Sequence, residues 1–158
     1  MLRRELVICG GAFLMGFAGM LPLLAGGDLT QQSPVEISVD LGSTANEFAF
    51  SPNQIGLETG KLYKVVLRNL GKEPHYFSSP GLASRVFTRK VVVSGPDGKV
   101  LGEIKGVIRE IEVFPGGISE WWFVPVQTGS FGDLHCGIRG ADGKTHAEKG
   151  MVGQITIK

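Results

Sequence analysis

Apolar and polar residues alternate along several short segments of the chain, and a period of two is typical of strands with one buried face. The alternation is clearest in residues 35–41, Val-Glu-Ile-Ser-Val-Asp-Leu, which follow a polar linker at residues 28–34. Residues 62–69 form another apolar stretch of strand length, and they lead into a loop that contains His75. Because helical periodicity is weak throughout, the pattern predicts a chain built from β-strands.

Turn residues separate the remaining strand segments. Proline and glycine in Gly95-Pro-Asp-Gly and in Pro115-Gly-Gly favour tight turns, so each motif is expected to connect the two strands of a hairpin. The segments that flank the two turns are residues 91–93, 99–101, 107–114 and 118–124. Residues 131–136 and 152–157 are expected to be the last two strands. Short strands at this spacing predict an all-β fold, a Greek-key β-sandwich of about seven or eight strands.

The first 27 residues differ in composition from the rest of the chain and are interpreted as a targeting segment. Arg3 and Arg4 precede an uncharged apolar run over residues 6–25, and small residues follow where a signal peptidase would cleave. The run is also long enough to span a membrane, so an uncleaved anchor is the alternative. In both cases the domain that follows is expected in the periplasm or another extracytoplasmic compartment, either secreted or attached to the membrane.

The length of 158 residues suits one domain, which is expected to occupy residues 35–158 and to be a monomer. A formal net charge of +1 without a basic patch argues against nucleic-acid binding. Removal of residues 1–27 would leave Cys136 as the only cysteine of an exported protein. An unpaired thiol in that compartment is explained if it binds a metal, whereas the alternative is an inert buried cysteine.

Four side chains carry the candidate chemistry: His75, Cys136, His146 and Met151. His75 follows a proline in Asn69-Leu-Gly-Lys-Glu-Pro-His, and the other three lie in that order near the C-terminus. Two imidazoles, one thiolate and one thioether suit a mononuclear copper ion, bound by a trigonal His₂Cys set with a long, weak axial Met. A structural zinc site would require more thiolates, and a dinuclear copper centre would require a second cysteine nearby.

This arrangement resembles the cupredoxin family of blue-copper proteins over residues 35–158. In that family one His comes from an early loop, and Cys, His and Met come from the loop between the last two strands. The motif that ends at His75 is similar to the plastocyanin first-ligand pattern, and His146-x₄-Met151 is similar to the end of the second loop. The resemblance implies one type 1 copper ion held by His75, Cys136, His146 and Met151.

The resemblance also implies that the chain transfers single electrons between redox partner proteins by cycling between Cu(I) and Cu(II). Four protein donors leave no position for a substrate, which favours electron transfer over catalysis. In the family the C-terminal ligand His lies beneath an apolar surface patch through which electrons enter or leave. His146 has that place here, and its expected neighbours in the patch are Gly150, Met151 and Val152.

Three features depart from the plastocyanin pattern. Nine residues separate Cys136 from His146, a longer loop than in plastocyanins and azurins and more like that of copper nitrite reductases. Tyr76 stands where plastocyanins carry an asparagine that links the two ligand loops. His135 precedes Cys136 as in multicopper enzymes, but successive side chains of a strand point to opposite faces, so His135 is not expected to bind the same ion.

Two other functions stay open. A periplasmic copper-binding or trafficking protein would use the same four residues to bind and deliver the ion. A nitrite-reductase-like copper enzyme subunit would need an open coordination position or a second metal, and only His135 and the long loop at 137–145 permit it. The sequence contains no Ser-His-Asp arrangement, phosphate loop or paired-carboxylate motif that would indicate a different chemistry.

Overall fold

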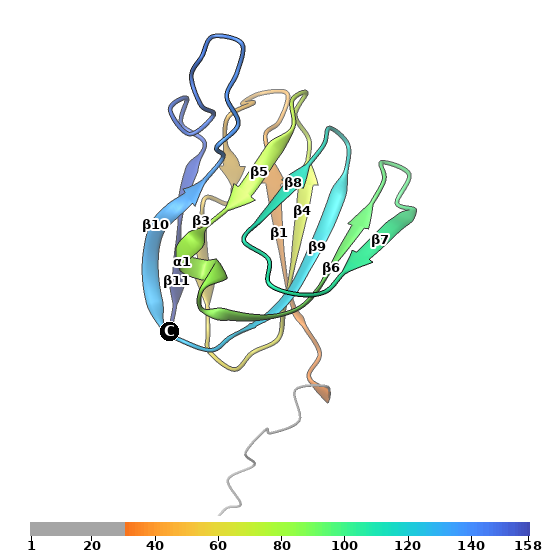
Figure 1. Ribbon diagram of the computed structural model, residues 1–158, viewed down its shortest axis with the longest axis vertical. Helices are drawn as coiled ribbons and strands as arrows, with labels where there is room; N and C mark the ends of the chain where they lie inside the picture. The colour runs from red at the N-terminus through yellow and green to blue at the C-terminus, as the bar shows by residue number, and fades with distance from the viewer. Residues whose placement is uncertain (1–30) are drawn as a thin grey trace, which may run out of the picture.

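Two β-sheets pack face to face as a sandwich (Figure 1). The computed structural model describes residues 31–158, and the expected signal or anchor segment at residues 1–27 lies outside the described residues. In chain order the elements are β1 (Val35–Leu41), β2 (Phe50–Ser51), β3 (Gln54–Leu57), β4 (Tyr63–Asn69), β5 (His75–Ser78), α1 (Pro80–Ala83), β6 (Val86–Ser94), β7 (Val100–Ile104), β8 (Glu110–Val113), β9 (Ile118–Pro125), β10 (Gly129–His135) and β11 (Val152–Ile157). Across residues 31–158, no helix combines the length and the apolar character that a membrane crossing requires.

The strand order defines a six-stranded and a five-stranded sheet. The larger sheet has the order β2-β1-β4-β9-β6-β7, and the smaller one has the order β3-β11-β10-β5-β8. β1 runs parallel to β4, and β11 runs parallel to β3, whereas the other strand pairs are antiparallel. The predicted all-β sandwich is therefore confirmed.

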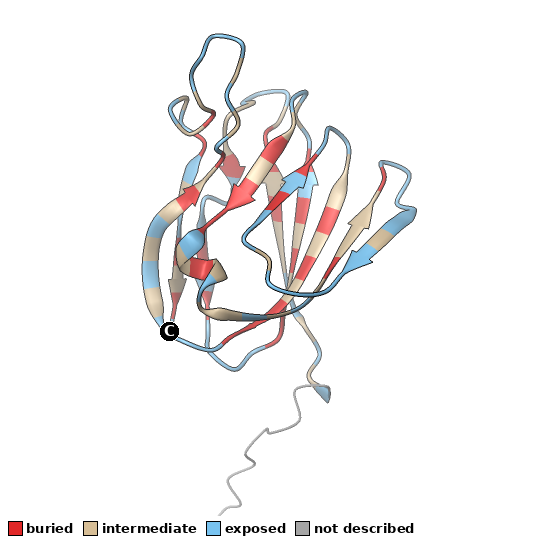
Figure 2. Cartoon of the chain, viewed as in Figure 1, coloured by how far each residue is buried: buried red, intermediate tan, exposed pale blue. Residues whose placement is uncertain are grey.

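The core lies between the two sheets, where most strands bury one face, whereas the edge strand β7 has no buried residue (Figure 2). Buried and less buried residues alternate along β4, as the period of two predicts. Large apolar side chains fill the interior, and the Phe77 ring on β5 packs edge-on against Trp121 on β9 across the sandwich. Such aromatic pairs contribute about 0.5–1.5 kcal/mol beyond their buried area. Since Phe77 follows His75 by two positions, this packing also fixes the strand that carries the histidine.

Several predicted strands match the structure. Residues 35–41 form β1, residues 62–69 correspond to β4, and residues 131–136 and 152–157 correspond to the antiparallel pair β10 and β11. The turn at Gly95 connects β6 to β7, so the first predicted hairpin is present.

The second predicted hairpin is wrong. β8 pairs with β5 in the smaller sheet, whereas β9 pairs with β4 and β6 in the larger sheet, so the turn at Pro115 crosses between the sheets. Backbone hydrogen bonds explain this crossing, because Asn69 at the end of β4 donates to Gly117 O (3.1 Å) and accepts from Gly116 N (3.0 Å). These bonds hold the segment before β9 beside β4 instead of beside β8.

The described residues contain eleven strands rather than seven or eight. β2 has two residues and β3 has four, so both are too short for alternation to mark them. β5 was expected as part of a loop, but it is a strand that begins at His75 itself.

The segments that contain the candidate ligands meet at one end of the sandwich. β4 ends there, β5 begins there, and the long connection between β10 and β11 projects from the same end (Figure 1). β1 begins at the opposite end, because its parallel register with β4 places Val35 opposite Tyr63 and Leu41 opposite Asn69.

Candidate metal centre

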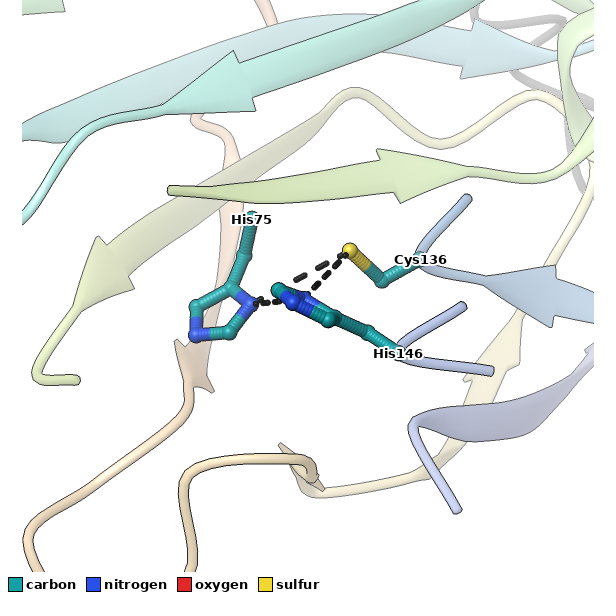
Figure 3. A group of neighbouring side chains, drawn as sticks. All are labelled: His75, Cys136 and His146. Carbon is teal, nitrogen blue, oxygen red and sulfur yellow. Dashed lines mark hydrogen bonds between the residues drawn. The ribbon is translucent and has the colours of Figure 1, made fainter. Parts of the chain in front are cut away.

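Three of the four candidate ligands converge at this end of the molecule (Figure 3). The Nδ1 atoms of His75 and His146 lie 3.1 Å apart, and Cys136 Sγ lies 3.9 Å from the first and 3.5 Å from the second. His75 begins β5, Cys136 follows β10 directly, and His146 lies in the loop before β11. Each imidazole therefore presents the same ring nitrogen to the thiol.

Met151 lies in the same loop as His146 and is bonded to the other ligands through its backbone. Its carbonyl accepts a hydrogen bond from Cys136 N (3.2 Å), and its amide donates to His146 O (2.9 Å). Its side chain is fully buried, as are those of His75, Cys136 and His146 (0% exposed). The loop thus holds three candidate ligands in a fixed backbone arrangement.

The sulfur of Cys136 receives backbone hydrogen bonds that tie the two ligand segments together. The amide of Tyr76 donates to Cys136 Sγ (3.2 Å), so β5 is linked to the end of β10 although an asparagine is absent at position 76. Burial raises the pKa of the Cys136 thiol, and the amides of Ile138 and Tyr76 act in the opposite direction. The raised pKa favours the protonated thiol in the metal-free site, so a bound metal would have to displace that proton.

The outer nitrogen of His75 faces a carboxylate. Nε2 lies 3.2 Å from Glu47 Oε1, so the ring N–H donates to that oxygen and leaves the Nδ1 lone pair directed at the cluster. Burial lowers the pKa of His75, with Glu47 opposing this effect and His146 adding to it. The imidazole is thereby kept in the neutral form that binds a metal.

The outer nitrogen of His146 faces a second carboxylate. Nε2 lies 2.9 Å from Glu73 Oε2, and the ring of Phe48 packs against the imidazole with its centroid 4.8 Å away. Of the three residues expected in a surface patch around this edge, Gly150 and Val152 are exposed, so the prediction is confirmed for them and wrong for the rest. Met151 is buried rather than on the surface, and a carboxylate covers the edge that an apolar patch was expected to surround.

Sequence reasoning missed Glu47 and Glu73. Neither belongs to a ligand motif, and both lie in loops whose course the hydrophobic pattern does not predict. Glu73 stands two positions before His75, and that proximity was the one available signal.

His135 lies outside the cluster that the described residues form. Its Nδ1 lies 2.8 Å from the carbonyl oxygen of Asp133, and its side chain is half-buried, whereas the next residue, Cys136, is fully buried. The opposite orientation of these two neighbours agrees with strand alternation.

The donor set fits a single type 1 copper ion. Two imidazole nitrogens and one sulfur lie within 4.8 Å of one another, and a thioether-bearing residue is fixed beside them. Thiolate and thioether are soft ligands that favour copper, and a His₂Cys set with a weak Met is the ligand set of blue-copper sites. The cluster of His75, Cys136, His146 and Met151 is thus consistent with one type 1 copper.

Comparison with known proteins bears on the fold. No family model matches the chain, and no curated protein is similar to it in sequence. Among solved structures, a multicopper oxidase from Campylobacter jejuni, a metallo-oxidase, is similar with a TM-score of 0.52 and 14% identity, over 81% of this chain and 31% of that one. The McoA multicopper oxidase from Aquifex aeolicus is similar with a TM-score of 0.51 and 13% identity, over 80% of this chain and 30% of that one.

A third similar structure is auracyanin A, a "blue" copper protein from Chloroflexus aurantiacus. It has a TM-score of 0.49 and 15% identity, over 80% of this chain and 100% of that one. By contrast, the chain spans only about a third of the length of each of the two multicopper oxidases. At these identities the likeness to the oxidases shows a shared fold.

Proposed function

We propose that this chain, which has a cupredoxin fold and a cluster typical of a type 1 copper site, is a mononuclear copper protein that transfers single electrons between redox partners. The observation that carries the proposal is the buried cluster of His75, Cys136 and His146. The buried Met151 is bonded through its backbone to the last two of these residues. Bound copper would supply the one-electron Cu(I)/Cu(II) couple.

The protein contributes a rigid set of donors. Backbone hydrogen bonds from Tyr76 N to Cys136 Sγ and from Met151 N to His146 O fix both ligand segments. A preorganised site of this kind changes little between two charge states, because its side chains are held by packing and hydrogen bonds. Such rigidity supports a role in electron transfer.

Burial of the ligands supports a carrier rather than an enzyme. All four candidate ligand side chains are fully buried, so a small substrate has no direct approach to the donors. An electron needs no such opening, whereas a catalytic metal site keeps one coordination position open for water or substrate.

The proposed location is the periplasm or another extracytoplasmic compartment. It is supported by the apolar run at residues 6–25, which would be a signal or an anchor, and by the unpaired Cys136. The domain begins with Val35 at the end of the sandwich opposite the ligands. Attachment through the N-terminal segment would therefore leave the metal end free to meet a redox partner.

A copper enzyme subunit is the second candidate, supported by the likeness to the two multicopper oxidases and by the His135–Cys136 pair. It would require His135 to hold another metal. Because Nδ1 of His135 contacts the Asp133 carbonyl, a second metal would have to bind to Nε2 of His135.

Absorption and paramagnetic resonance spectra of the Cu(II)-loaded protein test the proposal. One copper per chain and an intense visible band from thiolate-to-copper charge transfer are expected, with the band lost on reduction. Copper bound without that band would contradict a type 1 site, because the colour requires a copper–thiolate bond.

A further inference from the structure

Two carboxylates contact the outer ring nitrogens of the candidate ligand histidines. Resting on the proposed function, we propose that Glu47 and Glu73 are positioning residues that hold both imidazoles with Nδ1 toward the metal and that stabilise Cu(II) over Cu(I). Each binds the outer nitrogen of a different histidine, Glu47 on His75 and Glu73 on His146.

The contact between Glu47 and His75 is built into the backbone. The oxygen Glu47 Oε1 that faces His75 Nε2 also accepts hydrogen bonds from the amides of Lys72 (2.7 Å) and Glu73 (2.9 Å). Three donors thus converge on one oxygen of a carboxylate that is 21% exposed. The side chain is fixed in one orientation, which a chance surface contact would not achieve.

Two glycines make room for this contact. A Cβ atom on Gly42 would lie 2.8 Å from His75 Nε2, and a Cβ atom on Gly71 would collide with Glu47 Oε1. Gly42 also has a φ of +66°, a conformation that other residues rarely adopt. Both backbone segments therefore approach the Glu47–His75 pair as closely as glycine alone permits.

The loop between β4 and β5, whose amides bind Glu47, also supplies the Glu73 carboxylate that contacts His146. Asn69, which is buried at the end of β4, donates through Nδ2 to the carbonyls of Glu73 (2.8 Å) and Val113 (2.7 Å). Its Oδ1 accepts from Gly71 N (2.9 Å). Asn69 thereby fixes the segment that presents the Glu73 side chain to His146 and the amides to Glu47.

The negative charges of Glu47 and Glu73 explain why these residues would favour Cu(II). A carboxylate that accepts the outer N–H fixes the tautomer, increases the basicity of the inner nitrogen and adds negative charge near the metal. The more highly charged Cu(II) gains more from this than Cu(I) does. Burial of both rings strengthens the effect, since charges interact more strongly away from water.

The test replaces each carboxylate by an amide of the same shape. Glu47→Gln and Glu73→Gln keep an oxygen that can accept the imidazole N–H, and they remove the charge. Glu58→Gln is the matched control, because Glu58 pairs with Lys61 at the turn before β4, far from the ligands. The full chain is loaded with copper, and its reduction potential, Cu(II) affinity by competition and visible spectrum are measured.

Loss of a partner outside the ligand set typically lowers metal affinity 10- to 100-fold. A tenfold loss of affinity for Cu(II) alone raises the reduction potential of the copper by about 59 mV for one electron. We expect a change of at least this size in each variant, a larger one in the double variant and none in Glu58→Gln. Glu73 is half-exposed, so Glu73→Gln remains decisive if Glu47→Gln folds poorly.

Variants with the potential and Cu(II) affinity of the wild type would overturn the inference. Failure of the proposed function would look different, because the wild type itself would then lack the visible band or a reversible couple. The Cu(II) affinities would still test the two carboxylates in that case.

Discussion

The Nδ1 atoms of His75 and His146 lie 3.1 Å apart, although 71 positions separate the two residues in the chain. The start of β5 and the loop before β11 bring them together, and their outer nitrogens are held by Glu47 and Glu73. When both outer N–H groups donate to these carboxylates, the two inner nitrogens direct their lone pairs at each other. A cation bound by both nitrogens would relieve the repulsion between these lone pairs, so the arrangement favours metal binding.

The metal-free protein should lose stability as the pH falls through 6.5, the ordinary pKa of His75. Burial lowers the pKa of His75 in the folded chain, so the unfolded chain binds a proton that the folded chain does not, and acid favours unfolding. One such group contributes at most about 1.4 kcal/mol per pH unit.

Urea unfolding with a chelator at pH 7.5 and 5.5 measures this effect. The free energy of unfolding should fall less in His75→Gln than in the wild type over that interval. If the free energy of unfolding had the same pH dependence in both proteins, protonation of His75 would not be what destabilises the fold in acid.

Cys136 and Met151 should differ sharply in their effect on the copper site. Cys136→Ser should abolish the visible band, because the thiolate produces the colour and supplies the negative charge. Met151→Leu should keep both copper and colour and raise the potential, since a weak donor to Cu(II) is lost while the core volume is nearly conserved. Spectra and voltammetry of both variants give the comparison, and a visible band in the serine variant would exclude a thiolate-bound copper.

His135→Ala should leave the visible spectrum and the copper content close to those of the wild type. His135 is half-buried and contacts the Asp133 carbonyl instead of the cluster. Complete loss of copper in this variant would show that His135 is a ligand.

Asn69→Ala should destabilise the protein and weaken Cu(II) binding. It removes two donors and one acceptor, and each buried polar group left unpaired costs about 1–3 kcal/mol. The loop that carries Glu73 would lose its fixed position. Urea unfolding and copper competition measure the two effects, with Asn53→Ala at the exposed turn between β2 and β3 as the control. Wild-type Cu(II) affinity in Asn69→Ala would argue against a role for this loop in the site.

The sequence predicted the parts of the site that follow from local pattern. His75, Cys136, His146 and Met151 stand in motifs with fixed spacing, and the alternation of residues 35–41 marked β1. The sandwich itself followed from many short strands separated by turns.

The remaining features depend on contacts between distant segments. The turn at Pro115 has the composition of a hairpin, and only the backbone bonds of Asn69 with Gly116 and Gly117 show that it joins two sheets. Glu47 reaches His75 because Gly42 and Gly71 permit close packing, and neither glycine is distinguishable in the sequence from one in an ordinary turn.

Repeated electrochemical cycling of the copper-loaded protein, with a Cu(I) chelator present, tests the central claim most directly. A carrier whose donors are fixed and buried should show a reversible one-electron couple, and its copper content should stay constant over many cycles. Loss of copper to the chelator at each reduction would contradict the claim and indicate copper delivery. Turnover of nitrite or dioxygen without any partner would contradict it as well and indicate an enzyme.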